Sequence, residues 1–160
     1  MKKFIIAAIA FIGAIYFIPK MLGYGVVQNP SGSMRPTIEI GSYILVDWNA
    51  FNDSMPETND LVLFKYSDNP NESMIGRAIG LPDETVKIEN GITYVSGKAI
   101  EQSYIQDSFN THHSSLTFPE ITIPSEGVFV MGDARDLSND SRYKGPVRAQ
   151  NVIGKIIKVF

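Results

Sequence analysis

Beyond residue 27 the apolar residues come in short runs separated by turn residues, and this spacing constrains the fold of the chain most. Residues 43–46 and 61–64 are apolar runs bounded by Gly, Ser, Asn and Asp, which is typical of strands. The dipeptide Asn90-Gly91 between two such runs predicts a tight β-hairpin. Further strands are expected at 77–81, 85–88, 93–95, 121–123, 128–131 and 152–160. With no strong helical period in this part, the sequence predicts a mainly β domain.

Composition narrows the class of protein. A chain of 160 residues is long enough for one domain with a proper core plus an anchor. A net charge of −3, with 19% charged residues, gives no basic surface for nucleic acid. The absence of cysteine excludes thiol catalysis, Cys-ligated zinc and disulfides. The adjacent His112 and His113 would point to opposite sides of an extended segment, so a shared metal ion is not expected.

The N-terminus carries an uncharged apolar run at residues 4–18 after Lys2 and Lys3. The run fits the apolar region of a cleavable signal peptide, and it is shorter than the about 20 residues of a spanning helix. No small-x-small cleavage site follows it, and Lys20 can reach the headgroups, which lengthens the effective span. We therefore expect an uncleaved anchor over residues 1–24 with its N-terminus inside, and one β domain over residues 25–160 outside.

The stretch PSGSMRPT at residues 30–37 is the first candidate for chemistry. Gly32 allows a tight turn and Pro36 forbids a helix beyond it. Such a turn can present the Ser33 hydroxyl beside Ser31 and backbone N–H groups, which is the arrangement that acyl transfer needs. A plain surface turn rich in Ser, Gly and Pro is the alternative.

The second candidate is the polar stretch at residues 132–142, with the sequence GDARDLSNDSR. On an extended segment Asp140 and Arg142 share a face and could pair, and Ser138 and Asp140 could point the same way. A solvated loop and a cation-binding loop are the alternatives. The EF-hand pattern is not met, because its glycine and terminal glutamate are missing.

Together these stretches resemble the bacterial type I signal peptidases, which are membrane-anchored serine peptidases. The resemblance covers nearly the whole chain: after the anchor come PSGSMRPT, GSYILV, DLVLFKY, IGRAIGLPDE, NGITYVSGKAI and GDARDLSNDSRYKGPV, in that order. It implies that Ser33 is the nucleophile and that Ser31, with the backbone N–H of Ser33, forms the oxyanion hole. It further implies that Ser138 orients the general base and that Asp140 and Arg142 brace the site.

The resemblance also implies a fold, a substrate and a location. The expected fold is a coiled, largely antiparallel β-sheet domain whose apolar surface rests on a lipid bilayer, at the outer face of the cytoplasmic membrane. The expected partners are the signal peptides of exported preproteins, cut after a small-x-small motif by a monomer that needs no metal or organic cofactor. The substrate pocket would fall on Val27, Asn29, Met34, Ile44 and Ile75, and only residues 100–127 remain of a longer insertion.

The main departure from the family pattern is Gly76, which stands where the family has its general-base lysine. Arg77 cannot replace that lysine, because a guanidinium stays protonated. Three explanations remain: a weak or inactive homologue that still binds signal peptides or a partner peptidase, an altered copy of an active enzyme, or another base. Lys144, His112 and His113 are the candidates for another base. If only the base is missing, Gly76→Lys should create or raise activity.

Smaller departures bear on specificity. Asn29 is polar where the family has an apolar pocket residue, Ala134 and Leu137 replace asparagines, and Lys144 replaces a tryptophan. Asn29 and the Gly-Pro-Val stretch also resemble conjugative-transfer maturation peptidases of the same clan. The sequence thus leaves three hypotheses: a serine endopeptidase, a binding module of the same fold, and an anchored β domain without a site.

Overall fold

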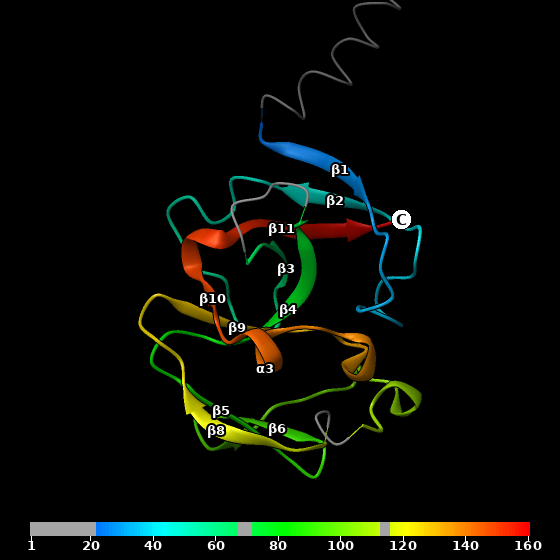
Figure 1. Ribbon diagram of the computed structural model, residues 1–160. Coiled ribbons are helices and arrows are strands. Elements are labelled where there is room, and N and C mark those ends of the chain that lie inside the picture. The colour runs from blue at the N-terminus through cyan, green and yellow to red at the C-terminus, as the bar shows by residue number, and fades with distance from the viewer. Residues whose placement is uncertain (1–21, 67–71, 113–115) are drawn as a thin grey trace, which may run out of the picture.

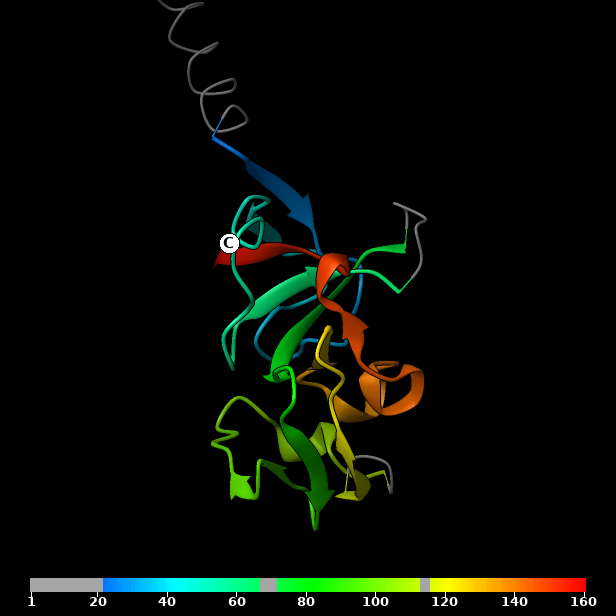
Figure 2. The same cartoon turned by 90° about the vertical axis from the view of Figure 1, so that its left-hand side faces the viewer.

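Two antiparallel sheets, one above the other in Figures 1 and 2, make up the part of the chain that the computed structural model describes, residues 22–66, 72–112 and 116–160. The larger sheet has the strand order β1-β2-β11-β3-β4-β9-β10, and the smaller has the order β7-β6-β5-β8. All strand pairs are antiparallel. The prediction of a mainly β domain is confirmed.

The strands of the larger sheet are β1 (Tyr24–Gln28), β2 (Tyr43–Asp47), β3 (Leu61–Phe64), β4 (Met74–Gly80), β9 (Gly127–Met131), β10 (Val147–Arg148) and β11 (Val152–Val159). Those of the smaller sheet are β5 (Thr85–Glu89), β6 (Ile92–Val95), β7 (Lys98–Ala99) and β8 (Phe118–Thr122). The helical segments are η2 (Asp107–Phe109), η3 (Arg135–Leu137), α3 (Ser141–Lys144) and η4 (Ala149–Asn151).

Most expected strands form where the apolar runs lie. The hairpin prediction is confirmed, because β5 and β6 pair around Asn90 and Gly91, with φ of 51° and 78°. Two strands begin three residues earlier than expected, β4 at Met74 and β8 at Phe118. β1, β7 and β10 lie in stretches for which no strand was predicted.

The expected anchor falls largely outside the described residues, which begin at Leu22. None of the helices within residues 22–66, 72–112 and 116–160 has the length and apolar character needed to cross a membrane. β1 begins at Tyr24, one residue before the expected start of the β domain. The anchor therefore remains a prediction from the sequence.

Strand β11 connects the two halves of the larger sheet, because it pairs with β2 on one side and with β3 on the other. Ile156 of β11, with Met34, Ile38, Ile44 and Val46, forms a buried apolar cluster under the Ser33 turn. Burying each such side chain stabilises the fold by about 1.5–3 kcal/mol. The cluster fixes the Ser33 turn against the centre of the sheet.

Candidate active site

A groove of about 390 Å³ opens on the larger sheet and brings both predicted serine stretches together. Ser31 and Ser33 lie on one wall, Ser138 and Asp140 on another, and residues of β3 and β4 form the floor. The prediction that Ser138 and Asp140 face the same way agrees with this geometry. The groove therefore joins parts of the chain that are about a hundred residues apart in sequence.

The buried side chain of Asn29 holds the turn that carries Ser31 and Ser33. Its Nδ2 donates to the carbonyl oxygens of Ser31 at 2.8 Å and Glu39 at 3.0 Å, and its Oδ1 accepts from the Ser31 N–H at 3.2 Å. Asn29 is 1% exposed, so these bonds form away from water. The sequence suggested a polar pocket wall at this position. The structure shows that the amide is occupied by the backbone of the turn.

The two predicted oxyanion donors are bonded to each other. The backbone N–H of Ser33 donates to Ser31 Oγ over 3.2 Å. This places the Ser31 hydroxyl beside the Ser33 amide, as the family resemblance implies. An anionic oxygen entering the groove would have to take over that N–H, since one hydrogen serves one good acceptor at a time.

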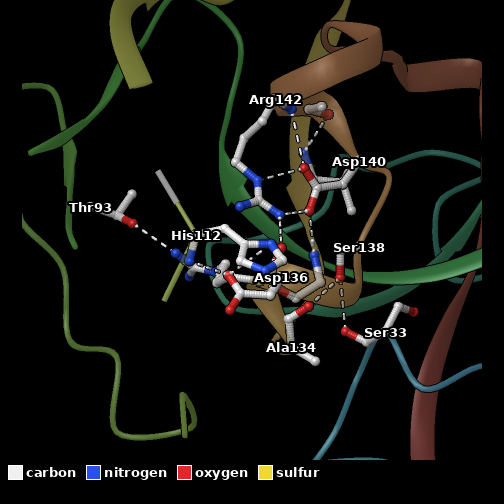
Figure 3. Close-up of polar contacts among 12 residues, drawn as sticks. Ser33, Thr93, His112, Ala134, Asp136, Ser138, Asp140 and Arg142 are labelled. Atoms are coloured by element: carbon white, nitrogen blue, oxygen red, sulfur yellow. Dashed lines mark hydrogen bonds and ion pairs between the residues drawn. The ribbon is translucent and has the colours of Figure 1, made fainter. Parts of the chain in front are cut away.

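The second serine stretch contacts the first through the Ser33 carbonyl. Ser33 O accepts from the Ala134 N–H at 3.0 Å and lies 3.1 Å from Ser138 Oγ, which is 2.8 Å from Ala134 O (Figure 3). The single Ser138 hydrogen can serve either carbonyl. Gly132 makes this contact possible, because a Cβ atom there would lie 1.8 Å from Ser138 Oγ. Ser138 thus braces the Ser33 turn.

Asp140 and Arg142 pair as predicted, through a geometry that was not predicted. Arg142 Nε and Nη2 donate to the two Asp140 carboxylate oxygens, each over 2.9 Å. The prediction of an extended segment is wrong: Asp140 caps the N-terminus of α3, and Arg142 lies in that helix. The Asp140 carboxylate also accepts from the Gly132 N–H at 3.0 Å. The pair therefore fixes the backbone on which Ser138 depends.

Two further buried arginines support the same region. Arg77 makes a two-pronged bond to Asp133, with distances of 2.9 and 2.7 Å, and the Thr37 hydroxyl donates to that carboxylate. Arg135 has no exposed surface, and burial lowers the pKa of its guanidinium. It donates to Gly132 O, Thr93 Oγ1 and Gln102 Oε1 at 3.2 Å each, which joins the site to the smaller sheet.

The position expected to hold the base is an apolar packing position. Gly76 lies on β4 opposite Val62 of β3. A Cβ atom there would lie 2.4 Å from Val130 Cγ1 and 3.1 Å from Phe64 Cε1. Val130 and Phe64 are core residues, so neither is free to move away. The space at the start of a side chain at position 76 is therefore filled by its neighbours.

The candidates for another base lie outside the groove lining. Lys144 Nζ lies 5.1 Å from the ring centre of Tyr66, in a neighbouring hollow lined by Glu72, Ser73 and Met74. His112 is mostly exposed, and its Nδ1 lies 3.9 Å from an Asp136 carboxylate oxygen (Figure 3). His113 lies outside the described residues. Among the groove residues that the structure describes, none is a lysine or a histidine.

The expected substrate-pocket residues divide into two groups. Val27, Asn29 and Ile75 line the groove. Met34 and Ile44 have no exposed surface and lie in the cluster beneath it. Across the described ranges no group of three or more His, Cys, Asp or Glu residues is placed to hold a metal ion.

Fold and site together define a mainly β protein in which two serine-bearing loops face one groove. A family profile described as "Signal peptidase, peptidase S26" matches residues 1–160. The chain belongs to this family, and the resemblance found in the sequence is confirmed.

Individual relatives agree with this assignment. Signal peptidase I of Leptolyngbya laminosa is 34% identical over 82% of this chain and 66% of its own length. Probable signal peptidase I-1 of Synechocystis sp. is 33% identical, with coverage of 82% and 68%. The chain therefore spans about two thirds of the length of these relatives. A solved signal peptidase I from Enterococcus faecalis V583 aligns with a TM-score of 0.53 and 28% identity, over 64% of this chain and 97% of that one.

Proposed function

We propose that this chain is a serine endopeptidase of the signal peptidase I type, which removes signal peptides from exported preproteins. The observation that carries the proposal is the groove in which Ser31 and Ser33 meet Ser138 and Asp140. Family membership supports the reaction class, since the profile matches the chain throughout.

In the proposed reaction Ser33 Oγ adds to the carbonyl carbon of the scissile peptide and gives a tetrahedral intermediate, which then collapses to the acyl-enzyme as the carbon–nitrogen bond breaks. The hydroxyl proton ends on the leaving amine, and water then hydrolyses the acyl-enzyme and restores Ser33. The Ser31 hydroxyl and the Ser33 N–H stabilise the oxyanion of each tetrahedral intermediate, an effect on the order of 10²–10³ in rate for one donor. A serine hydroxyl is a weak nucleophile unless a base takes its proton.

The absence of a lysine or histidine from the described groove lining favours a second candidate function, binding without cleavage. In that case the chain holds signal peptides, or a partner peptidase, in the same groove. Of the described candidates for a base, Lys144 lies in a hollow that adjoins the groove, because Ser73 and Met74 line both.

The proposal includes a membrane location. Residues 1–24 would anchor the chain in the cytoplasmic membrane, with the β domain (residues 25–160) on the outer face as a monomer. Lys2 and Lys3 before the apolar run support this orientation. The exposed apolar side chains Leu22, Val26 and Phe160 support contact with lipid.

The deciding experiment is cleavage of a membrane-presented preprotein by the purified full-length chain, beside Ser33→Ala. Cleavage that disappears in Ser33→Ala would establish the nucleophile and place the base outside position 76. Lys144→Gln and His112→Gln would then identify that base. Cleavage at an unchanged rate in Ser33→Ala would rule out Ser33. Signal-peptide binding without any cleavage would select the second candidate.

A further inference from the structure

The single tryptophan of the chain lies in the wall of the groove. Trp48 follows β2 directly, and its backbone N–H donates to Gly23 O over 2.8 Å. Its side chain lines the same groove as Ser33 and remains 37% exposed. An aromatic side chain in this position is anchored on one side and accessible on the other.

Gly25 on the neighbouring strand β1 makes room for the indole ring. A Cβ atom at Gly25 would lie 2.5 Å from Trp48 Nε1, whereas one at Gly154 of β11 would be in ordinary contact with Trp48 Cε3 at 3.5 Å. β1 and β11 flank β2 on its two sides. The ring therefore lies close to both neighbouring strands, at a place where a side chain on β1 would displace it.

The indole lies on the inner face of the sheet. Ile44 and Val46, which share the strand parity of Trp48, are fully buried. The outer face of the sheet carries Tyr43 of β2, which is 56% exposed, and Val26 of β1, which pairs with Leu45 and is 60% exposed. Trp48 thus extends the apolar inner face into the groove, away from the outer apolar surface assigned above to lipid.

The lining of the groove around Trp48 suits an uncharged ligand. Within the described lining Asp140 is the one charged side chain, and Arg142 neutralises it. Val27, Leu63 and Ile75 supply apolar surface between Trp48 and the serines. A peptide segment with apolar side chains matches this lining, whereas a charged segment would lose its hydration without gaining a partner.

We propose that Trp48 is a specificity-determining residue, whose indole packs against an apolar side chain of the extended peptide bound at Ser33. This inference rests on the proposed function and adds a property of the substrate: one apolar side chain, at a fixed distance along the peptide from the scissile bond. Aromatic rings provide large, well-defined contact surfaces of this kind.

The test uses Trp48 as its own probe, since no other tryptophan is present. The full-length Ser33→Ala chain in non-ionic detergent is titrated with a synthetic signal peptide that spans the cleavage site. We expect a saturable blue shift of tryptophan emission, with the same midpoint as the anisotropy of a labelled copy of the peptide. Replacing the apolar peptide residues one at a time by aspartate should remove the shift at one position.

Variants provide the second measurement. Trp48→Ala should weaken peptide binding about tenfold, as expected for the loss of one buried aromatic contact. Tyr43→Ala, on the outer face of the same strand, is the matched control and should bind unchanged. If circular dichroism shows that Trp48→Ala does not fold, Trp48→Phe replaces it, with an expected loss of about threefold because part of the ring contact remains.

The outcomes separate this inference from the proposed function. Peptide binding with unchanged Trp48 emission, or with unchanged affinity in the folded Trp48 variant, would overturn the inference and leave the function standing. An equal blue shift on raising the detergent concentration in the absence of peptide would assign Trp48 to the membrane phase and would also overturn it. Absence of any peptide binding would overturn both.

Discussion

The loops around Ser138 and the strand position at Gly76 are held in place by different kinds of interaction. The loops are held by buried charged groups, with Asp140 bonded to Arg142 and Asp133 bonded to Arg77. Position 76 is held by apolar contact with Val130 and Phe64. A network of buried charges fails when one member is lost, whereas an apolar position tolerates change only within its volume. The groove thus has buried polar support around the serine stretches, next to a strand position where apolar neighbours fill the space of a side chain.

The largest effect is expected from breaking the buried pair. Asp140→Ala would remove the carboxylate that pairs with the buried Arg142 guanidinium and accepts from the Gly132 N–H. Such a change costs about 3–5 kcal/mol of folding free energy. Urea unfolding measures it, with Glu89→Gln, which breaks an exposed Lys87 pair, as the control expected to cost far less because water screens that pair. Equal losses in both variants would show that the two pairs do not differ.

Filling position 76 should have the next largest effect. Gly76→Ala should cost about 1–3 kcal/mol by overpacking. The same change in a Val130→Ala background should cost less, because the Cβ atom then has room. Unfolding of the single and double variants measures this coupling. A loss at position 76 that is independent of residue 130 would contradict the packing explanation.

This packing also changes the expectation for restoring a base. Gly76→Lys alone should remain inactive and less stable, because its Cβ meets Val130 Cγ1 at 2.4 Å. Gly76→Lys with Val130→Ala should show cleavage that depends on Ser33. Preprotein cleavage by the two variants is the measurement. Activity of Gly76→Lys alone would show that the core moves more easily than its contacts indicate.

A smaller effect is expected at Asn29. Asn29→Leu removes the part-buried bonds to the Ser31 and Glu39 backbone and leaves those groups without the amide as a partner, at a cost of about 1 kcal/mol. It should also loosen the Ser31–Ser33 turn and weaken peptide binding. Tyr43→Ala, at an exposed position that does not line the groove, serves as the control. A stable Asn29→Leu variant with unchanged peptide binding would mean that the Ser31–Ser33 turn does not need the Asn29 bonds.

The smallest effect concerns Tyr66, which lies 3.1 Å from Ser141 Oγ and donates to Gly145 O. Burial raises the pKa of Tyr66 from 10.0 to about 12. The pKa of Tyr66 in the folded state lies above its value in the unfolded state. The contribution of the protonated Tyr66 hydroxyl to folding stability is therefore fully present below pH 10 and is lost as the pH rises toward 12. Between pH 10 and 12 the free energy of unfolding should fall less steeply with pH in Tyr66→Phe than in the unmodified protein. Identical pH dependence in both proteins would contradict the raised pKa.

Local sequence patterns predicted features that depend on neighbouring residues, whereas the meeting of the two serine stretches was expected from the family resemblance alone. The β5–β6 hairpin follows from Asn90-Gly91, and the Asp140–Arg142 pair from a short spacing. β1 was missed because its apolar residues continue the pattern of the preceding segment. The four-residue helix α3 is too short to show a period.

Within the site, two contacts could not be read from the sequence. Asn29 lines the groove as expected, but its bonds to the Ser31 and Glu39 backbone depend on how the turn folds back. The contact of position 76 with Val130 depends on the pairing of β4 with β9. Both contacts join residues that are apart in the sequence, which local patterns do not encode.

The place of β11 in the sheet has a consequence for biosynthesis. This strand is the last of the described strands to be synthesised, yet it lies between β2 and β3. Until it emerges and crosses the chain, the β1–β2 hairpin with the Ser33 turn has no edge on which to dock. Closing such a long-range pairing is a slow step in folding. The nascent protein therefore carries both serine stretches before the sheet that supports the groove is complete.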